Sequence, residues 1–213
     1  MDKRRLEENV FKGLMIAATF MVVGSLFAVF FVVILKGAPA LSLSMITEIP
    51  KGGYYLGKGG GILNAIVGSL CLGVEATVLA LVIALPVALF LQREYIGRSK
   101  FARVTRLSLD VLWGVPSIVY GAFGFIIMLY LGIRACLLGG IIALTLLELP
   151  IMIRAMDEVV KMVPQELKEA SYAVGATRLE TTLKIVCRQA LPGLLTAILL
   201  AFGRGIGDAA SIL

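Results

Sequence analysis

Long apolar runs alternate with shorter polar segments along the chain. Crossing a bilayer core of about 30 Å takes about 20 helical residues at about 1.5 Å each. Five runs have that length and carry almost no charge, so each is expected to be a membrane-spanning helix. They lie at 14–35, 62–91, 111–133, 137–156 and 191–213. The pattern therefore predicts an all-α protein, a polytopic bundle of transmembrane helices.

Prolines lie inside three of these runs, at Pro86, Pro116 and Pro150. Each is expected to break its helix, which membrane helices tolerate when neighbouring groups satisfy the freed carbonyls. Glycines such as Gly121 and Gly124 let helix backbones approach closely. The spans are therefore expected to pack against protein as well as lipid.

The composition supports a membrane protein and excludes several activities. Hydrophobic residues make up 59% and charged residues 16%, against about 45–50% and about 25% in soluble domains. Such a chain is neither disordered nor soluble without large exposed apolar patches. The chain has no histidine, which excludes nucleophile–histidine catalysis and histidine metal sites. No cluster of metal-ligating residues is visible in the sequence, so no metal or cofactor is expected. The chain has no Walker motif, so it is not itself expected to hydrolyse ATP.

Basic residues are concentrated in three segments: the N-terminus, residues 93–106 and residues 154–188. Cytoplasmic loops of membrane proteins carry an excess of lysine and arginine. The three segments, and with them the N-terminus, are therefore expected in the cytoplasm. The net charge of +6 follows from this topology, and nucleic acid is not an expected partner.

A glycine-rich run at 51–61 is expected to be a flexible external loop. A phosphate cradle is the alternative. It is disfavoured because no strand precedes the run and no Gly-Lys-Ser/Thr sequence follows.

The polar segment at about 157–189 carries strong helix signals. A helix over 165–174 can begin after Pro164 and end at Gly175, which accepts a left-handed conformation. The sequence from Thr177 to Glu180 has the pattern of a capping box that opens a second helix. Two short helices hinged at Gly175 are therefore expected to project from the membrane. A plain amphipathic loop at the membrane surface is the alternative.

This segment resembles the EAA loop of ABC-importer permeases. The matching residues are Glu169, Ala170, Gly175 and Ile185, with Ser171 where the family usually has alanine. The usual Leu-Pro after the isoleucine is replaced by Cys-Arg, and a Leu-Pro comes slightly later. The resemblance implies that the four matching residues belong to a coupling element that docks in a groove of an ATPase subunit.

Other stretches are similar to the PstA-type membrane permease subunit of the phosphate ABC importers. They are Gly60–Ser69, Arg93–Tyr95, Asp110–Gly121 with its Gly-Val-Pro-Ser-Ile-Val-Tyr-Gly, Ala173–Arg178 and Gly203–Ala210. The resemblance implies a type I ABC-importer permease fold in the bacterial inner membrane. It also implies a subunit that forms half of a phosphate path. The implied partners are two ATPase subunits, a homologous permease of PstC type, an extracytoplasmic phosphate-binding protein and membrane lipid.

The expected organisation has two parts. Residues 1–61 form the cytoplasmic N-terminus, the first span and the external loop, and residues 62–213 form the permease core. Permeases of this type resemble six-span proteins, so the C-terminal span is expected to be missing. A permease for another oxyanion, molybdate or sulfate, and a membrane scaffold without transport activity are the alternatives.

Charged residues inside the spans are the candidates for the transport path. Arg204 and Asp208 are four residues apart on one expected helix. Together they either contact the anion, as guanidinium groups do, or form an internal pair that only orders packing. Ser117 follows a proline that frees backbone donors near a passing anion. The roles of Glu75 and Glu148 remain open.

Overall fold

The computed structural model describes residues 3–50, 60–92, 94–132 and 136–208. Within these residues the chain is helical and contains no strand. The chain divides into two units, residues 1–64 and 65–213, and each is described by itself. Most of the glycine-rich run, residues 51–59, lies outside the described residues.

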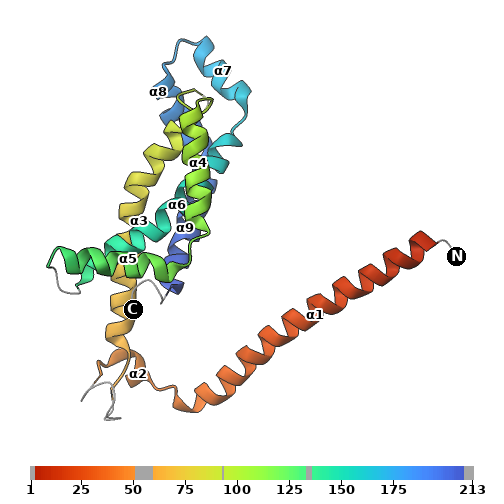
Figure 1. Ribbon diagram of the computed structural model, residues 1–213, viewed down its shortest axis with the longest axis vertical. Helices are drawn as coiled ribbons and strands as arrows, with labels where there is room; N and C mark the ends of the chain where they lie inside the picture. The colour runs from red at the N-terminus through yellow and green to blue at the C-terminus, as the bar shows by residue number, and fades with distance from the viewer. Residues whose placement is uncertain (1–2, 51–59, 93, 133–135, 209–213) are drawn as a thin grey trace. The chain divides into compact units, whose positions relative to one another are not determined.

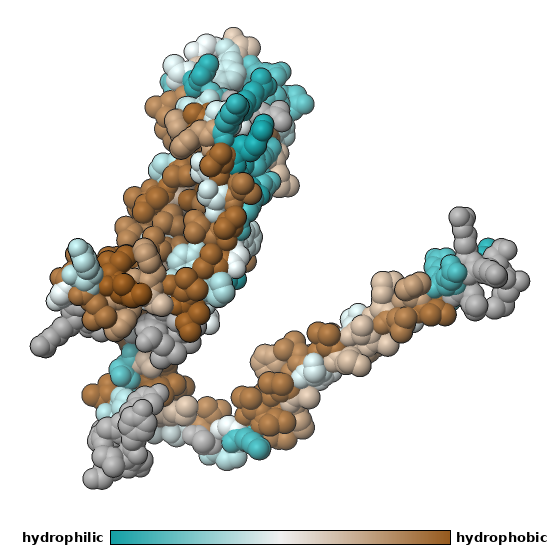
Figure 2. Space-filling view, viewed as in Figure 1, coloured by the Kyte–Doolittle hydropathy of each residue, from teal (hydrophilic) through white to brown (hydrophobic). Residues whose placement is uncertain are grey.

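The first unit consists mainly of one long helix, α1 (Lys3–Gly37). A 3-10 turn (Ala38–Ala40) and the short helix α2 (Leu43–Thr47) follow it. The described side chains of α1 are exposed almost throughout, and Figure 2 shows apolar residues along most of its length. A helix that is apolar on all sides belongs in a membrane. This confirms a helix over the predicted span at 14–35.

The second unit is a bundle of helices (Figure 1). Helices α3, α4, α6 and α9 contribute to one core, α7 and α8 lie at one end of the bundle, and α5 crosses near the other end. Apart from a π-helical segment at Thr181–Val186, the helices are α3 (Leu63–Phe90), α4 (Lys100–Trp113), α5 (Ser117–Tyr130), α6 (Leu137–Lys161), α7 (Gln165–Ala173), α8 (Arg178–Glu180) and α9 (Cys187–Gly207).

In the described part of the chain, four helices are long and apolar enough to cross a membrane. They are α1, α3, α6 and the run Arg178–Gly207. The pair α4 and α5 adds a fifth if it is counted as one span. The helices expected from the pattern are thus present, but the expected third span at 111–133 is not one helix.

The third span is bent by 98° between α4 and α5. Helix α4 starts at Lys100, inside the basic segment expected to be a loop, and ends at Trp113. Pro116 then serves as the N-cap of α5. Proline disfavours helical geometry in the preceding residue and cannot donate a helical hydrogen bond, so the chain turns here.

The other two expected breaks are wrong. Pro86 lies inside the unbroken α3 and Pro150 inside the unbroken α6. A membrane helix can lose one backbone hydrogen bond at a proline when its neighbours hold it on both sides of that position. Helix α6 passes through Pro150 and continues to Lys161, beyond the expected end of the span at residue 156.

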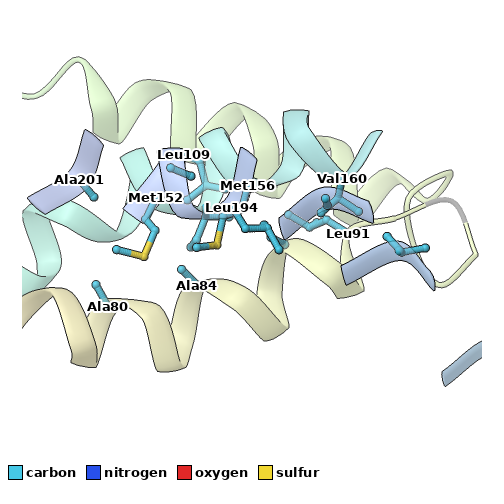
Figure 3. Close-up of a cluster of buried hydrophobic side chains, with 14 of the residues drawn as sticks. Ala80, Ala84, Leu91, Leu109, Met152, Met156, Val160, Leu194 and Ala201 are labelled. Atoms are coloured by element: carbon cyan, nitrogen blue, oxygen red, sulfur yellow. The ribbon is translucent and has the colours of Figure 1, made fainter. Parts of the chain in front are cut away.

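Small residues line the inner face of α3. Buried residues recur on it about every turn, and they are Gly73, Ala76, Thr77, Ala80, Ala84 and Ala88. Figure 3 shows Ala80 and Ala84 facing the cluster that includes Met152 and Met156. Small side chains on α3 let the larger side chains of α6 fill the space between the helices. This packing fixes the rotational position of α3 against α6.

Candidate functional site

A buried carboxylate holds the bundle together at the end near α7. The side chain of Asp157 on α6 is fully buried. Arg106 of α4 donates to it through Nε (2.8 Å) and Nη2 (3.0 Å), and Lys161 approaches Oδ2 to 2.6 Å. Gln92 donates to Oδ1 at 3.2 Å. We name these four residues the Asp157 cluster; it joins α4, α6 and the end of α3.

Helix α7 is attached to the connection between α3 and α4 by a second buried ion pair. Lys168 Nζ donates to Glu94 Oε1 at 3.0 Å, and the two side chains are only 6% and 13% exposed. Arg178 Nη1 donates to the backbone oxygen of Glu94 at 3.1 Å. Glu94 therefore holds both α7 and the start of α8 beside the connection between α3 and α4. We call residues 162–177, which lie within the predicted EAA loop at about 157–189, the coupling loop.

The turn at the end of α7 confirms the predicted left-handed conformation of Gly175. Helix α7 ends at Ala173, and Gly175 has a φ of +84°. The N–H groups of Gly175 and Ala176 donate back to Tyr172 (3.0 Å) and Ser171 (3.2 Å), as at other helix ends closed by a left-handed residue. The chain thus reverses at Gly175.

The predicted capping box is also present, but the helix that it opens is not short. Thr177 and Glu180 exchange the two capping hydrogen bonds. The helix that starts at Arg178 then continues without a break to Gly207. The second of the two expected short helices is therefore the beginning of a membrane span, because the π-helical segment keeps the chain helical between α8 and α9.

The predicted coupling residues divide into two places. Glu169 and Ala170 are exposed on α7, next to Gly175. Ile185 is half-buried in the π-helical segment. Three of the four residues therefore lie on the exposed coupling loop, and the fourth lies on the helix that leads into the membrane.

A cleft of about 780 Å³ opens beside α7. It is lined by Glu94, Arg98, Gln165, Glu169, Tyr172, Ala176, Thr177 and Arg178. Burial and the nearby Glu94 raise the pKa of the Tyr172 phenol above its usual range. Tyr172 therefore stays a neutral hydroxyl within a surface of mixed charge, and Figure 2 shows hydrophilic residues at this end of the unit.

The π-helical segment is tied to both neighbouring elements. The Cys187 N–H bonds the Thr182 oxygen five residues earlier, as in a π-helix. The hydroxyls of Thr181 and Ser171 share a hydrogen bond of 2.9 Å, and those of Thr182 and Tyr95 share one of 3.1 Å. Hydrogen bonds therefore connect α7 and the connection between α3 and α4 directly to the start of the helix that leads to α9.

The predicted path residues lie at the other end of the unit. Arg204 is exposed in the last turn of α9. Asp208 is the C-cap residue, partly buried, with φ −96° and ψ 91°, so the regular helix ends one residue before it. Ser117, one turn before Tyr120, is the partly buried first residue of α5.

The two acidic residues left open by the sequence have opposite surroundings. Glu75 is exposed on α3. Glu148 on α6 is fully buried and accepts a hydrogen bond of 2.9 Å from Thr77. Sequence reasoning missed Glu94, Lys168 and the Asp157 cluster. Glu94 lies in the stretch Arg93–Tyr95 that carries the family resemblance, but nothing in the sequence indicates which residues these side chains contact.

The Lys168–Glu94 pair predicts a measurable effect on α7. Changing Lys168 to methionine leaves Glu94 unpaired and largely buried, which costs about 3–5 kcal/mol. Amide hydrogen exchange in α7 should therefore become much faster. The double variant Lys168→Met/Glu94→Gln should recover most of the protection, because no charge remains buried.

The matched control for this prediction is Lys184→Met. Lys184 and Glu180 form an ion pair of 3.7 Å whose side chains are 74% and 48% exposed, so its loss should leave exchange almost unchanged. Equal exchange in the Lys168 variant and the parent chain would show that the pair does not hold α7.

Comparison with known proteins defines the class. The fold matches a chain of the MetNI methionine ABC transporter in an inward-facing conformation with a TM-score of 0.63. The match covers 68% of this chain and 70% of that chain at 24% identity. The protein is thus a multi-pass membrane protein with a type I ABC-importer permease fold.

The sequence comparisons identify the family. Residues 77–213 match the family model described as the binding-protein-dependent transport system inner membrane component, and the chain belongs to this family. It is 41% identical over 155 residues to the phosphate transport system permease protein PstA 1 of Mycobacterium tuberculosis, covering 72% of this chain and 50% of the relative.

Two further relatives are covered more completely. The chain is 36% identical to the phosphate transport system permease protein PstA of Yersinia pestis, over 87% of this chain and 62% of the relative. It is 33% identical to the PstA protein of Pasteurella multocida, over 99% of this chain and 74% of the relative. The chain therefore spans about half the length of the mycobacterial relative and about three quarters of the one from Pasteurella.

Proposed function

We propose that this chain is the membrane-spanning subunit of an ATP-driven phosphate importer. It forms half of the translocation path and couples to the ATPase through the coupling loop. Its partners are two ATPase subunits, a homologous permease of PstC type and an extracytoplasmic phosphate-binding protein. Its N-terminus faces the cytoplasm, as the basic segments predict.

The observation that carries this proposal is the similarity to phosphate transport permeases over most of the chain. These relatives are 33–41% identical. The matched residues include the helix that carries Arg204 and the whole coupling loop. ATP hydrolysis then belongs to the separate ATPase chains.

The geometry supports a coupling role for the loop. Glu169 and Ala170 are exposed, while Lys168, only one residue earlier in the sequence, is buried against Glu94. Helix α7 thus presents one face to a partner and fixes the other to the permease. The run Arg178–Gly207 begins beside this docking surface and ends in the turn that carries Arg204, so it connects the ATPase contact with the path.

The geometry also supports Arg204 as the anion contact. Its guanidinium keeps its charge at physiological pH and binds phosphate oxygens in pairs. Arg204 is exposed in the single chain, so a second permease subunit can pack beside it and close a path around it. Asp208 directly follows the end of the helix that carries Arg204, and Ser117 remains a proposed path residue as the first residue of α5.

The test is the uptake of labelled phosphate and labelled sulfate by cells that express the chain with its partner genes. Phosphate uptake should depend on the chain and sulfate uptake should not. Arg204→Lys and Arg204→Ala should each lower phosphate uptake about tenfold or more, because a charge-assisted contact contributes about 1.5–3 kcal/mol. Co-purification with the ATPase should remain normal.

The double variant Arg204→Ala/Asp208→Ala separates the anion contact from a purely structural pair. If Arg204 only balances Asp208, removal of both charges should restore stability and uptake. An assembled double variant without uptake supports the anion contact. Restored uptake contradicts it, and sulfate uptake equal to phosphate uptake contradicts the choice of substrate.

A further inference from the structure

Glu148 is a buried acid with one unused oxygen in the middle of the bundle. It is fully buried on α6, and its Oε2 accepts the hydrogen bond from Thr77 of α3. Among the described residues, Oε1 has no hydrogen-bond partner. This oxygen lies against Gly205 of α9, where even a methyl group would overlap it. The carboxyl therefore joins α3, α6 and α9 at a single point.

The residue that covers the unused oxygen, Gly205, directly follows a positively charged residue in the sequence. A buried carboxylate is costly unless it takes up a proton or pairs with a positive group, and charged residues in membrane spans pair with one another. The residue before Gly205 is Arg204, whose side chain is exposed in this structure. Arg204 is therefore adjacent in sequence to a residue that contacts Glu148, but its side chain is exposed while that of Glu148 is buried.

The π-helical segment provides a way to bring them together. A π-helix closes hydrogen bonds over five residues rather than four, so it holds one more residue than the same length of α-helix. If Thr181–Val186 became α-helical with its start fixed, α9 would advance by one residue, about 100° and about 1.5 Å. Position 204 would move toward the place of Gly205. Because a side chain in that place would overlap Glu148, the long arginine side chain is expected to reach the carboxylate after only part of the rotation.

The segment also lies where a signal from the coupling loop arrives. Ser171 of α7 binds Thr181, and Tyr95, from the connection that holds α7, binds Thr182. A movement of α7 therefore changes the hydrogen bonds at the start of the π-helical segment. The π-helical segment, with its one extra residue, therefore lies between the coupling loop and the last turn of α9, which carries Arg204.

We propose that Glu148 is an alternative partner of Arg204 and positions it during transport. In the arrangement seen here Gly205 covers Glu148 and Arg204 is free to contact an anion. When α9 rotates, Arg204 pairs with Glu148 and releases the anion. The inference rests on the proposed assignment of Arg204 to the path, and it makes Glu148 a positioning residue that need not touch the substrate.

The test uses a hydrophobic carbodiimide, which modifies protonated carboxyls in apolar surroundings. The assembled complex is labelled without nucleotide and after trapping with ATP and vanadate, and Glu148 is analysed by mass spectrometry. Labelling should be several-fold lower in one state, because a carboxylate paired with Arg204 is ionised and does not react. In the Arg204→Ala complex this difference should disappear.

Two controls define the result. Glu75, exposed on α3, should be labelled equally in both states. Deletion of Leu183, an exposed residue of the π-helical segment, should remove the extra residue and abolish the difference at Glu148. Equal labelling of Glu148 in the two states of the parent complex, including none in either, overturns the proposal. A difference that persists in Arg204→Ala also overturns it.

A functional variant distinguishes positioning from packing. Glutamine at position 148 keeps the size of the side chain and an acceptor for Thr77, but it has no charge to offer Arg204. Phosphate uptake by Glu148→Gln should fall several-fold with assembly unchanged, whereas unchanged uptake overturns the positioning role. The labelling result does not depend on which anion is carried, so the Glu148 proposal and the choice of phosphate as substrate can fail separately.

Discussion

Replacing Asp157 by asparagine is expected to lower the free energy of unfolding by about 3–5 kcal/mol, because it leaves Arg106, whose side chain is only 21% exposed, without its counter-charge. Arg106 and Lys161 both depend on this carboxylate. Arg106 also donates to the backbone oxygens of Leu91 (2.6 Å) and Gly97 (3.4 Å), so its displacement also loosens the connection between α3 and α4. Unfolding in detergent, followed by circular dichroism against denaturant, measures the loss.

Glu158→Gln is the matched control for this prediction. Glu158 also contacts Lys161, at 3.0 Å, but its side chain is 58% exposed. Solvent screens such a pair, so the variant should lose less than about 1 kcal/mol. Similar losses in the two variants would mean that burial of Asp157 does not determine the strength of its contacts.

The approximate limits of the long membrane-spanning helices, apart from the bent third span, follow from composition and length. A run such as 62–91 has no stable alternative to a helix in a membrane, because every backbone group must be satisfied within the segment. The structure accordingly has α3 at Leu63–Phe90. The start of α9 was missed because the polar residues before it continue the same helix through the π-helical segment.

The three prolines show that a proline alone does not predict a break in a membrane helix. Pro86 and Pro150 are carried inside helices, while Pro116 accompanies a bend of 98°. The distinguishing feature at Pro116 is its neighbourhood: Gly114, the C-cap residue of α4, lies two residues before it, and glycine holds a helix less firmly than other residues. Whether a proline breaks a membrane helix therefore depends on the residues around it as well as on the proline itself.

The local features of the coupling loop were predictable, and its attachments were not. Gly175 and the capping box involve residues close in sequence, whose geometry depends on local backbone chemistry. The Lys168–Glu94 contact joins residues 74 positions apart, and Arg106–Asp157 joins residues 51 positions apart. Local sequence patterns do not indicate which distant charges meet once the helices pack, so these contacts required the structure.

Replacing Gly175 by valine is expected to uncouple the transporter proposed here without preventing its assembly. Gly175 has a φ of +84°, and a side chain placed there would meet no atom within 4 Å. The cost is therefore backbone strain alone, about 1–2 kcal/mol, which the membrane bundle can absorb. The turn would relax and shift α7 relative to Thr177, which begins the helix toward Arg204.

The measurement is ATP hydrolysis by the purified complex with and without the phosphate-loaded binding protein. Stimulation should be largely lost in Gly175→Val, while co-purification of the ATPase stays normal. Gly175→Asn is the matched control, because asparagine adopts left-handed conformations more readily than other residues with side chains, and it should keep most of the stimulation. If valine and asparagine reduce stimulation equally, a side chain at this exposed position obstructs docking and the left-handed turn is not the cause. Full stimulation in the assembled valine complex would remove Gly175 from the coupling path.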